Sequence, residues 1–96
     1  MKVIWTPQAE QDRSEIFDFI AERNPRAAVA MDTLFGQQAA RLAEHPLIAP
    51  PGKIPGTRDL IPHENYRLVY EVQDDAVWVL ALVHVARPWP PVSRSN

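Results

Sequence analysis

Two strand-forming runs separated by a pair of aspartates constrain the fold of this chain more than any other feature. Residues 65–72 and 76–85 are rich in β-branched and aromatic side chains, and Asp74-Asp75 lies between them. A two-residue turn is the simplest connection between two such runs. The sequence therefore predicts an antiparallel β-hairpin in the C-terminal third of the chain.

The turn also predicts which side chains share a face of the hairpin, because side chains alternate along a strand. A two-residue turn pairs Arg67 with Leu82 and Asn65 with His84, which makes Arg67 and His84 diagonal neighbours on one face. A three-residue turn would move each side chain of one strand to the opposite face and break this pairing. The opposite face is apolar throughout and is expected to pack on helices: Tyr66, Leu68, Tyr70, Val72, Val77, Val79, Ala81 and Val83.

The N-terminal half predicts one short strand and two helices. Residues 2–5 have high β propensity. Thr6-Pro7 and Asn24-Pro25 each place a capping residue before a proline, which is typical of a helix start. The first helix is expected to reach about residue 22, and the second to end at His45-Pro46.

The rest of the chain completes the predicted fold. Residues 46–57 form a proline- and glycine-rich loop, residues 58–61 a strand, and residues 62–64 a turn. The order β-α-α-β-β-β predicts an α+β fold, with a small antiparallel sheet and the helix hairpin packed on one of its faces. We expect one domain over residues 1–91 and a disordered tail over residues 92–96.

Composition narrows the class of protein. The chain has 96 residues, no cysteine and a formal net charge of −2, which suits a single domain of a reducing cytoplasm. It has no apolar run long enough to span a membrane. The histidines lack metal-ligand spacing, so neither a metal nor another cofactor is expected. The acidic balance argues against a protein that mainly binds phosphate backbones.

Arg67 and His84 form the centre of a candidate anion site. Arg67 either pairs with Glu71 on its own strand or clamps a phosphate or carboxylate with its donor fork. His84 either packs among its apolar neighbours or transfers protons near neutral pH. Arg87 follows the strand end, with no carboxylate nearby in sequence.

Three further side chains are candidates for contact with a target. Lys53 and Arg58 would add positive charge near Arg67. Trp89 lies between two prolines in a segment that cannot continue a helix or a central strand. It either plugs a sheet edge or offers a stacking surface.

The motifs together resemble those of the RelE/ParE superfamily of toxins from type II toxin–antitoxin modules. The resemblance rests on Tyr66-Arg67-Leu68-Val69-Tyr70, the acidic turn, and the ending His84-x-x-Arg87. Gly56-Thr57-Arg58-Asp59-Leu60 and Trp89-Pro90 fit the same pattern. The resemblance implies the fold order given above and a bacterial growth inhibitor that a cognate antitoxin neutralises.

The superfamily implies two alternative activities. RelE-like members cut mRNA on the ribosome, and in such a nuclease Arg67 and His84 would be the catalytic residues. ParE-like members poison DNA gyrase without catalysis, and here Lys53, Arg58, Arg87 and Trp89 would contact the target. The chain lacks a tyrosine after its last strand and is acidic, which favours the ParE-like branch. A binding module in which Arg67 is only structural is the alternative from another class.

Overall fold

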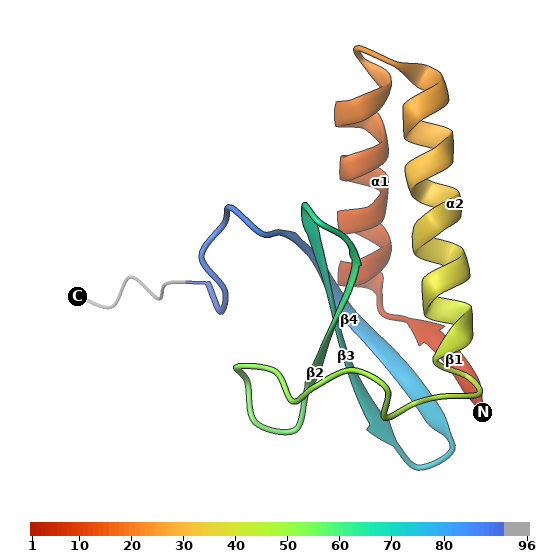
Figure 1. The fold of residues 1–96 in the computed structure, drawn as a ribbon, viewed down its shortest axis with the longest axis vertical. Coiled ribbons are helices and arrows are strands. Elements are labelled where there is room, and N and C mark those ends of the chain that lie inside the picture. Colours follow the sequence, from red (N-terminus) through yellow and green to blue (C-terminus); the bar gives the residue numbers. More distant parts are fainter. Residues whose placement is uncertain (92–96) are drawn as a thin grey trace.

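The fold is a helix hairpin on one face of a four-stranded sheet (Figure 1). A computed structural model describes residues 1–91, so the expected tail at 92–96 lies outside the described residues. The predicted α+β class and element order are confirmed. The elements are β1 (Lys2–Trp5), α1 (Pro7–Ala21), α2 (Pro25–Arg41), β2 (Arg58–His63), β3 (Tyr66–Gln73) and β4 (Ala76–His84).

Both helices begin where the sequence predicts. The Thr6 hydroxyl accepts a hydrogen bond from the Ala9 amide at 3.2 Å, and the Asn24 side chain accepts one from the Ala27 amide at 3.1 Å. Each cap satisfies one of the amides that a helix start leaves unpaired. The α-helical geometry of α2 ends at Arg41, four residues before the predicted end, and the chain continues in tighter turns to His45.

Arg13 ties the two helices to the first strand. Its guanidinium donates to both carboxylate oxygens of Asp32 on α2, at 2.6 and 3.2 Å, and lies 4.7 Å from the Trp5 ring centroid. A bidentate arginine–carboxylate pair fixes orientation as well as distance. The helix hairpin is therefore held in register above β1. Among residues 1–91, no helix is long and apolar enough to cross a membrane.

The sheet is mixed, with strand order β1-β4-β3-β2. Strands β2, β3 and β4 are antiparallel, as predicted, but β1 pairs in parallel with β4, from Lys2↔Ala76 to Trp5↔Val79. This pairing joins the first strand of the chain to the last, so no turn sequence between neighbouring elements predicts it. At the other edge, β2 extends through Pro62 to His63, beyond the predicted end. A bulge and an edge position accommodate this proline.

A β-bulge at Leu80 changes the register of the main hairpin. The two-residue turn is correct, since Gln73 pairs with Ala76, and the pairs match the prediction up to Tyr70↔Val79. The next pair is Val69↔Ala81, so Leu80 is an extra residue on β4. The predicted pairings of Arg67 with Leu82 and of Asn65 with His84 are therefore wrong.

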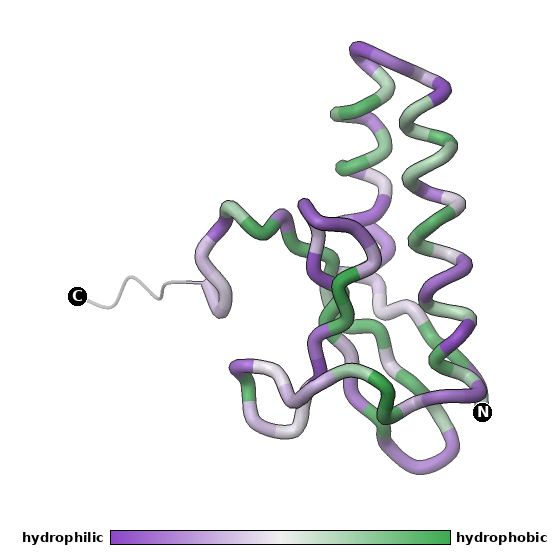
Figure 2. Tube along the Cα trace, in the orientation of Figure 1, coloured by the Kyte–Doolittle hydropathy of each residue, from purple (hydrophilic) through white to green (hydrophobic). Residues whose placement is uncertain are grey.

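The core lies between the sheet and the helices. Leu68 and Tyr70 of β3 are fully buried, as are Val77 and Val79 of β4, and they pack on the helix side as predicted. Beyond the bulge, Leu82 takes the core position that the sequence assigned to Ala81. Figure 2 shows hydrophobic residues recurring along the strands and along both helices. The helix side contributes Ala9, Phe35, Ala39 and Leu42.

Candidate functional site

The bulge places Arg67 and His84 on opposite faces of the sheet. Arg67 pairs with Val83, and His84 pairs with Tyr66, whose ring belongs to the core on the helix side. Adjacent residues of a strand point to opposite faces, so Arg67 lies on the face away from the helices, called here the open face. The predicted Arg67–His84 site does not form.

On the open face, Arg67 is committed to a carboxylate. Its Nε lies 3.5 Å from Oδ2 of Asp59 on β2, and the two side chains are only 18% and 14% exposed. Arg67 does pair with a carboxylate, but the predicted partner, Glu71, is wrong. The carboxylate beside Arg67 belongs to Asp59. The contact is an ion pair without a hydrogen bond, since Nε of Arg67 and Oδ1 of Asp59 are buried and have no hydrogen-bond partner among the described residues.

The proline- and glycine-rich loop closes over this ion pair. A Cβ atom on Gly52 would lie 2.6 Å from Oδ1 of Asp59 and 2.7 Å from the Thr57 hydroxyl oxygen. Both distances are below van der Waals contact, so only glycine lets the loop backbone come this close. The loop thus keeps Asp59 and Arg67 largely out of water.

Burial raises the pKa of the Asp59 carboxyl above its usual 3.8, and Arg67 and then Lys53 partly offset that rise. The folded protein therefore holds this proton more tightly than the unfolded chain. As a consequence, the contribution of Asp59 to the free energy of unfolding falls as pH rises through the window above 3.8.

We expect Asp59→Asn to reveal this titration. The free energy of unfolding of the wild type minus that of the variant should fall as the pH rises through 3.8 and beyond, and then level off once the carboxyl is ionised in the folded protein as well. Urea unfolding at closely spaced pH values measures it, and the other carboxyls cancel in the difference. A difference that increases with pH would show that the attraction of Arg67 outweighs burial.

Arg58 holds the loop through two backbone carbonyl groups. Its Nη1 donates to the carbonyl oxygens of Ala49 at 2.6 Å and Leu47 at 3.5 Å. The Tyr70 hydroxyl fixes the same segment, because it donates to the Pro46 carbonyl at 2.8 Å and accepts from the Ala49 amide at 3.4 Å. Together these side chains anchor the start of the loop to the sheet.

His84 belongs to an aromatic row that the sequence did not reveal. His63 and His84 pair with Tyr66 from either side, and the His84 ring lies 5.3 Å from the Tyr66 ring at 80°. Each histidine accepts a backbone amide hydrogen bond at Nδ1, from Asn65 at 3.1 Å and from Ala86 at 3.0 Å. A neutral ring that accepts at Nδ1 carries its proton on Nε2. Among residues 1–91, no cluster suits a metal ion.

Two cavities lie beside the part of β4 that follows Val79, where β1 no longer pairs with it. The open-face cavity, of about 560 Å³, lies between the loop and the C-terminal segment, and its lining includes Ile54, Pro55, Val69, Leu80, Ala81 and Trp89. The helix-side cavity, of about 490 Å³, lies between α1 and the sheet, and its lining includes Ile16, Phe19, Tyr66 and His84. Asp12, Leu82 and Arg87 line both cavities.

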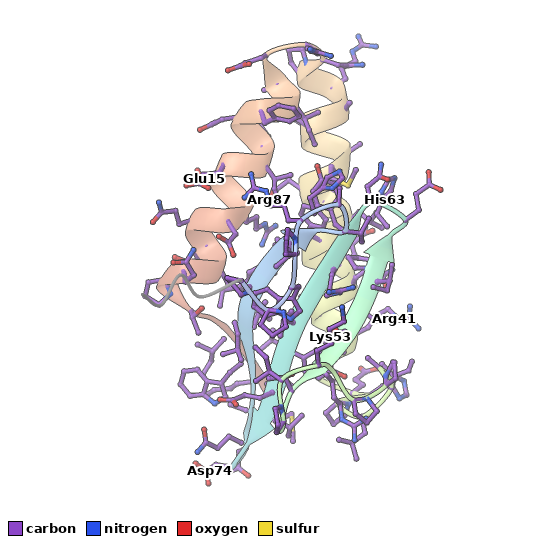
Figure 3. The ribbon with its side chains drawn as sticks, turned by 90° about the vertical axis from the view of Figure 1, so that its left-hand side faces the viewer. Glu15, Arg41, Lys53, His63, Asp74 and Arg87 are labelled. Atoms are coloured by element: carbon purple, nitrogen blue, oxygen red, sulfur yellow. The ribbon has the colours of Figure 1, made fainter. Side chains whose placement is uncertain are left out.

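Of the remaining predicted contact residues, Arg87 and Trp89 line the open-face cavity, and Lys53 precedes its lining residue Ile54. Arg87 is exposed, and Figure 3 shows it at the same end of the sheet as Glu15. Lys53, exposed on the loop, is labelled lower in the same view. Trp89 is half-buried, and its Nε1 has no hydrogen-bond partner among the described residues. Trp89 therefore lies partly enclosed in the lining of the open-face cavity.

Within residues 1–91, the charged side chains around the open face balance one another. Lys53, Arg67 and Arg87 are balanced by three carboxylates, which belong to Asp12, Asp59 and Glu71. A surface that binds a phosphate backbone is ordinarily basic. The charge of this face therefore suits a protein partner better than a nucleic acid.

Comparison with known proteins agrees with this architecture. Residues 3–89 match the family model described as "ParE toxin of type II toxin-antitoxin system, parDE". A relative from Sinorhizobium fredii, named "Putative toxin Y4kP", is 32% identical over 92 residues, which cover 95% of each chain.

Solved structures share the fold at low sequence identity. A chain of the chromosomal ParDE system from P. aeruginosa superposes with a TM-score of 0.80 at 21% identity, covering 88% of this chain and 96% of that one. The YoeB/ParE toxin from Agrobacterium tumefaciens gives a TM-score of 0.62 at 17% identity, covering 88% and 98%.

Proposed function

This chain belongs to the ParE toxin family of type II toxin–antitoxin systems, and on that premise we propose that it arrests bacterial growth by poisoning DNA gyrase and not by cutting mRNA. The family implies a cognate antitoxin as its partner. A gyrase target would also place its action in the cytoplasm.

The separation of Arg67 from His84 is the observation that carries the proposal. A nuclease that promotes attack by a 2′-hydroxyl needs positive charge and a proton-transfer group at one phosphate. Here the bulge turns His84 to the helix side, while Arg67 stays on the open face in a pair with Asp59. The two candidate catalytic groups therefore cannot serve one substrate without a change of register.

Two further observations support a protein target. In the part of the chain that the structure describes, the open face is balanced in charge, and its cavity is lined mainly by apolar side chains, with Trp89 at one side. Aromatic and arginine side chains are enriched where proteins bind one another strongly. Lys53, Arg87 and Trp89 are accordingly the proposed contacts, whereas the hydrogen bonds of Arg58 favour a structural role.

Two assays on the same purified protein test the proposal. In a gyrase reaction with plasmid DNA, we expect trapped double-strand cleavage and loss of supercoiling. In a cell-free translation reaction, primer extension should find the reporter mRNA intact. Cuts at fixed codon positions that depend on ribosomes and vanish in Arg67→Ala would instead establish the nuclease and overturn the proposal.

Substitutions at the open face should separate contact residues from structural ones. We expect Arg87→Ala and Trp89→Ala each to raise the toxin concentration needed for gyrase cleavage about tenfold, equivalent to about 1.4 kcal/mol of binding. Arg23→Ala, in the connection between the helices, is the matched control, because it removes an exposed arginine at the far end of the molecule. Equal effects from all three variants would contradict the assignment.

A further inference from the structure

Arg67 turns the two ends of its guanidinium to different surroundings. Its Nε nitrogen is buried and lies 3.5 Å from Oδ2 of Asp59. Within residues 1–91, its two Nη nitrogens have no hydrogen-bond partner, and Nε is the one nitrogen of this side chain that is both buried and unpaired. The side chain is 18% exposed, so the part that solvent reaches includes the Nη fork. Such a fork can bind a phosphate through two parallel hydrogen bonds.

The proline- and glycine-rich loop holds the Asp59 carboxylate beside this fork. The Gly52 amide donates to the Thr57 carbonyl at 2.8 Å, and the Asp59 amide donates to the Pro50 carbonyl at 3.2 Å. These two bonds fix the loop backbone to the start of β2. A Cβ atom on Gly52 would lie 2.6 Å from Oδ1 of Asp59. One carboxylate oxygen therefore faces Arg67 and the other faces the loop, and no rotation about the carboxylate bond removes its charge from the guanidinium.

The contact between Asp59 and Arg67 has poor geometry for a stabilising ion pair. Nε and Oδ2 are 3.5 Å apart, and Nε and Oδ1 are buried without a hydrogen-bond partner among the described residues. Burial raises the pKa of the Asp59 carboxyl, and Arg67 and then Lys53 offset this rise only in part. The cost of burying such a carboxylate can exceed the attraction that it gains. Its main effect is therefore to neutralise the charge of Arg67.

We propose that Asp59 determines the specificity of the open face, because its charge keeps Arg67 from binding the phosphate backbone of a nucleic acid. A phosphate at the Nη fork would also approach the Asp59 carboxylate, and like charges repel most strongly where the site is partly buried. A neutral residue at position 59 would leave one uncompensated positive charge beside the fork. The inference rests on the proposed choice of a protein target over a nucleic acid and assigns that choice to one residue.

Two isosteric substitutions test the inference, because each removes one negative charge from the same face. Asp59→Asn removes the carboxylate beside Arg67, whereas Glu71→Gln removes one that lines the open-face cavity and forms no ion pair with Arg67. The probe is a fluorescein-labelled single-stranded RNA of about 12 nucleotides, and fluorescence anisotropy measures the Kd. We expect Asp59→Asn to lower the Kd at least about tenfold, the scale of one charge-assisted hydrogen bond. Glu71→Gln should lower it less than about threefold.

The salt dependence and a double variant identify the group that binds the RNA. One additional phosphate contact in Asp59→Asn should steepen the slope of log Kd against log salt concentration by about 0.7. The tighter binding and the steeper slope should both disappear when Asp59→Asn is combined with Arg67→Gln. Equal gains from Asp59→Asn and Glu71→Gln, or a gain that survives the loss of Arg67, would overturn the inference. Circular dichroism and thermal unfolding establish that the variants are folded.

The wild-type protein provides a readout that needs no substitution. Addition of the same RNA at low salt should leave the NMR signal of the Arg67 Nε–H group in place, and a shift that saturates with RNA would overturn the inference. The gyrase reaction on the wild type keeps the two proposals distinguishable. Gyrase cleavage without tighter RNA binding in Asp59→Asn would overturn the role of Asp59 alone. Tighter RNA binding in Asp59→Asn without gyrase cleavage by the wild type would support that role and overturn gyrase as the target.

Discussion

Tyr70→Ala should lower the free energy of unfolding by about 3–5 kcal/mol, the cost of removing a large buried aromatic ring. Tyr70 is fully buried between the sheet and α2, and it is the largest side chain in the core with no exposure. Its hydroxyl also holds the start of the loop through Pro46 and Ala49. Urea unfolding followed by circular dichroism measures the loss.

Tyr70→Phe separates the two contributions of this side chain. The ring stays, but the Pro46 carbonyl and the Ala49 amide lose a partner, which should cost about 1–3 kcal/mol. The loop should also exchange its amide hydrogens faster than in the wild type. If Tyr70→Phe is as stable as the wild type, water replaces the hydroxyl and the loop does not depend on it.

Phe35→Ala should be comparably severe, at about 3–5 kcal/mol. Phe35 is 1% exposed on α2, and its ring meets Tyr66 edge-on, with 5.4 Å between the centroids. Removing it leaves a cavity beneath the aromatic row that contains His63 and His84. Thermal or urea unfolding would report the change.

Phe19→Ala provides the matched control, since Phe19 is 68% exposed on α1. The same substitution there should change the free energy of unfolding by less than about 0.5 kcal/mol. Equal destabilisation by the two substitutions would contradict the core described here.

The local signals in the sequence were sufficient for the helix starts and the hairpin turn. Thr6-Pro7 and Asn24-Pro25 act through bonds to residues three positions away, and Asp74 adopts a positive φ of 56° in the turn. Such features depend on a few adjacent residues, so they can be recognised without knowledge of the rest of the fold.

The register beyond Leu80 could not be predicted for a physical reason. From Val77 to Val83 every residue of β4 is apolar, so either alternation buries hydrophobic side chains and neither is excluded by a polar residue in the core. Distant groups support the observed register, since the Thr6 hydroxyl binds the carbonyl of the bulge residue Leu80 and the Asp12 carboxylate binds the Leu82 amide after it. The predicted anion site was wrong for the same reason, because it required Arg67 and His84 to lie on the same face of the sheet.

The partner of Arg67 was missed for a similar reason. Glu71 lies on the same strand and is the nearest carboxylate in sequence, but Asp59 is brought beside Arg67 by the pairing of β2 with β3. The proline- and glycine-rich loop before β2 then covers the pair of Asp59 and Arg67. An interaction across strands needs the register before it can be assigned.

The parallel pairing of β1 with β4 also has a consequence for how the chain is made. Lys2 leaves the ribosome first, but its partner Ala76 is among the last residues of the domain to be added. Contacts between distant parts of a chain form only after the intervening loop has been closed. During synthesis, β1 therefore has no strand to join, and both cavities beside β4 are missing. A growing chain of this toxin cannot form either cavity until β4 (Ala76–His84) has been made.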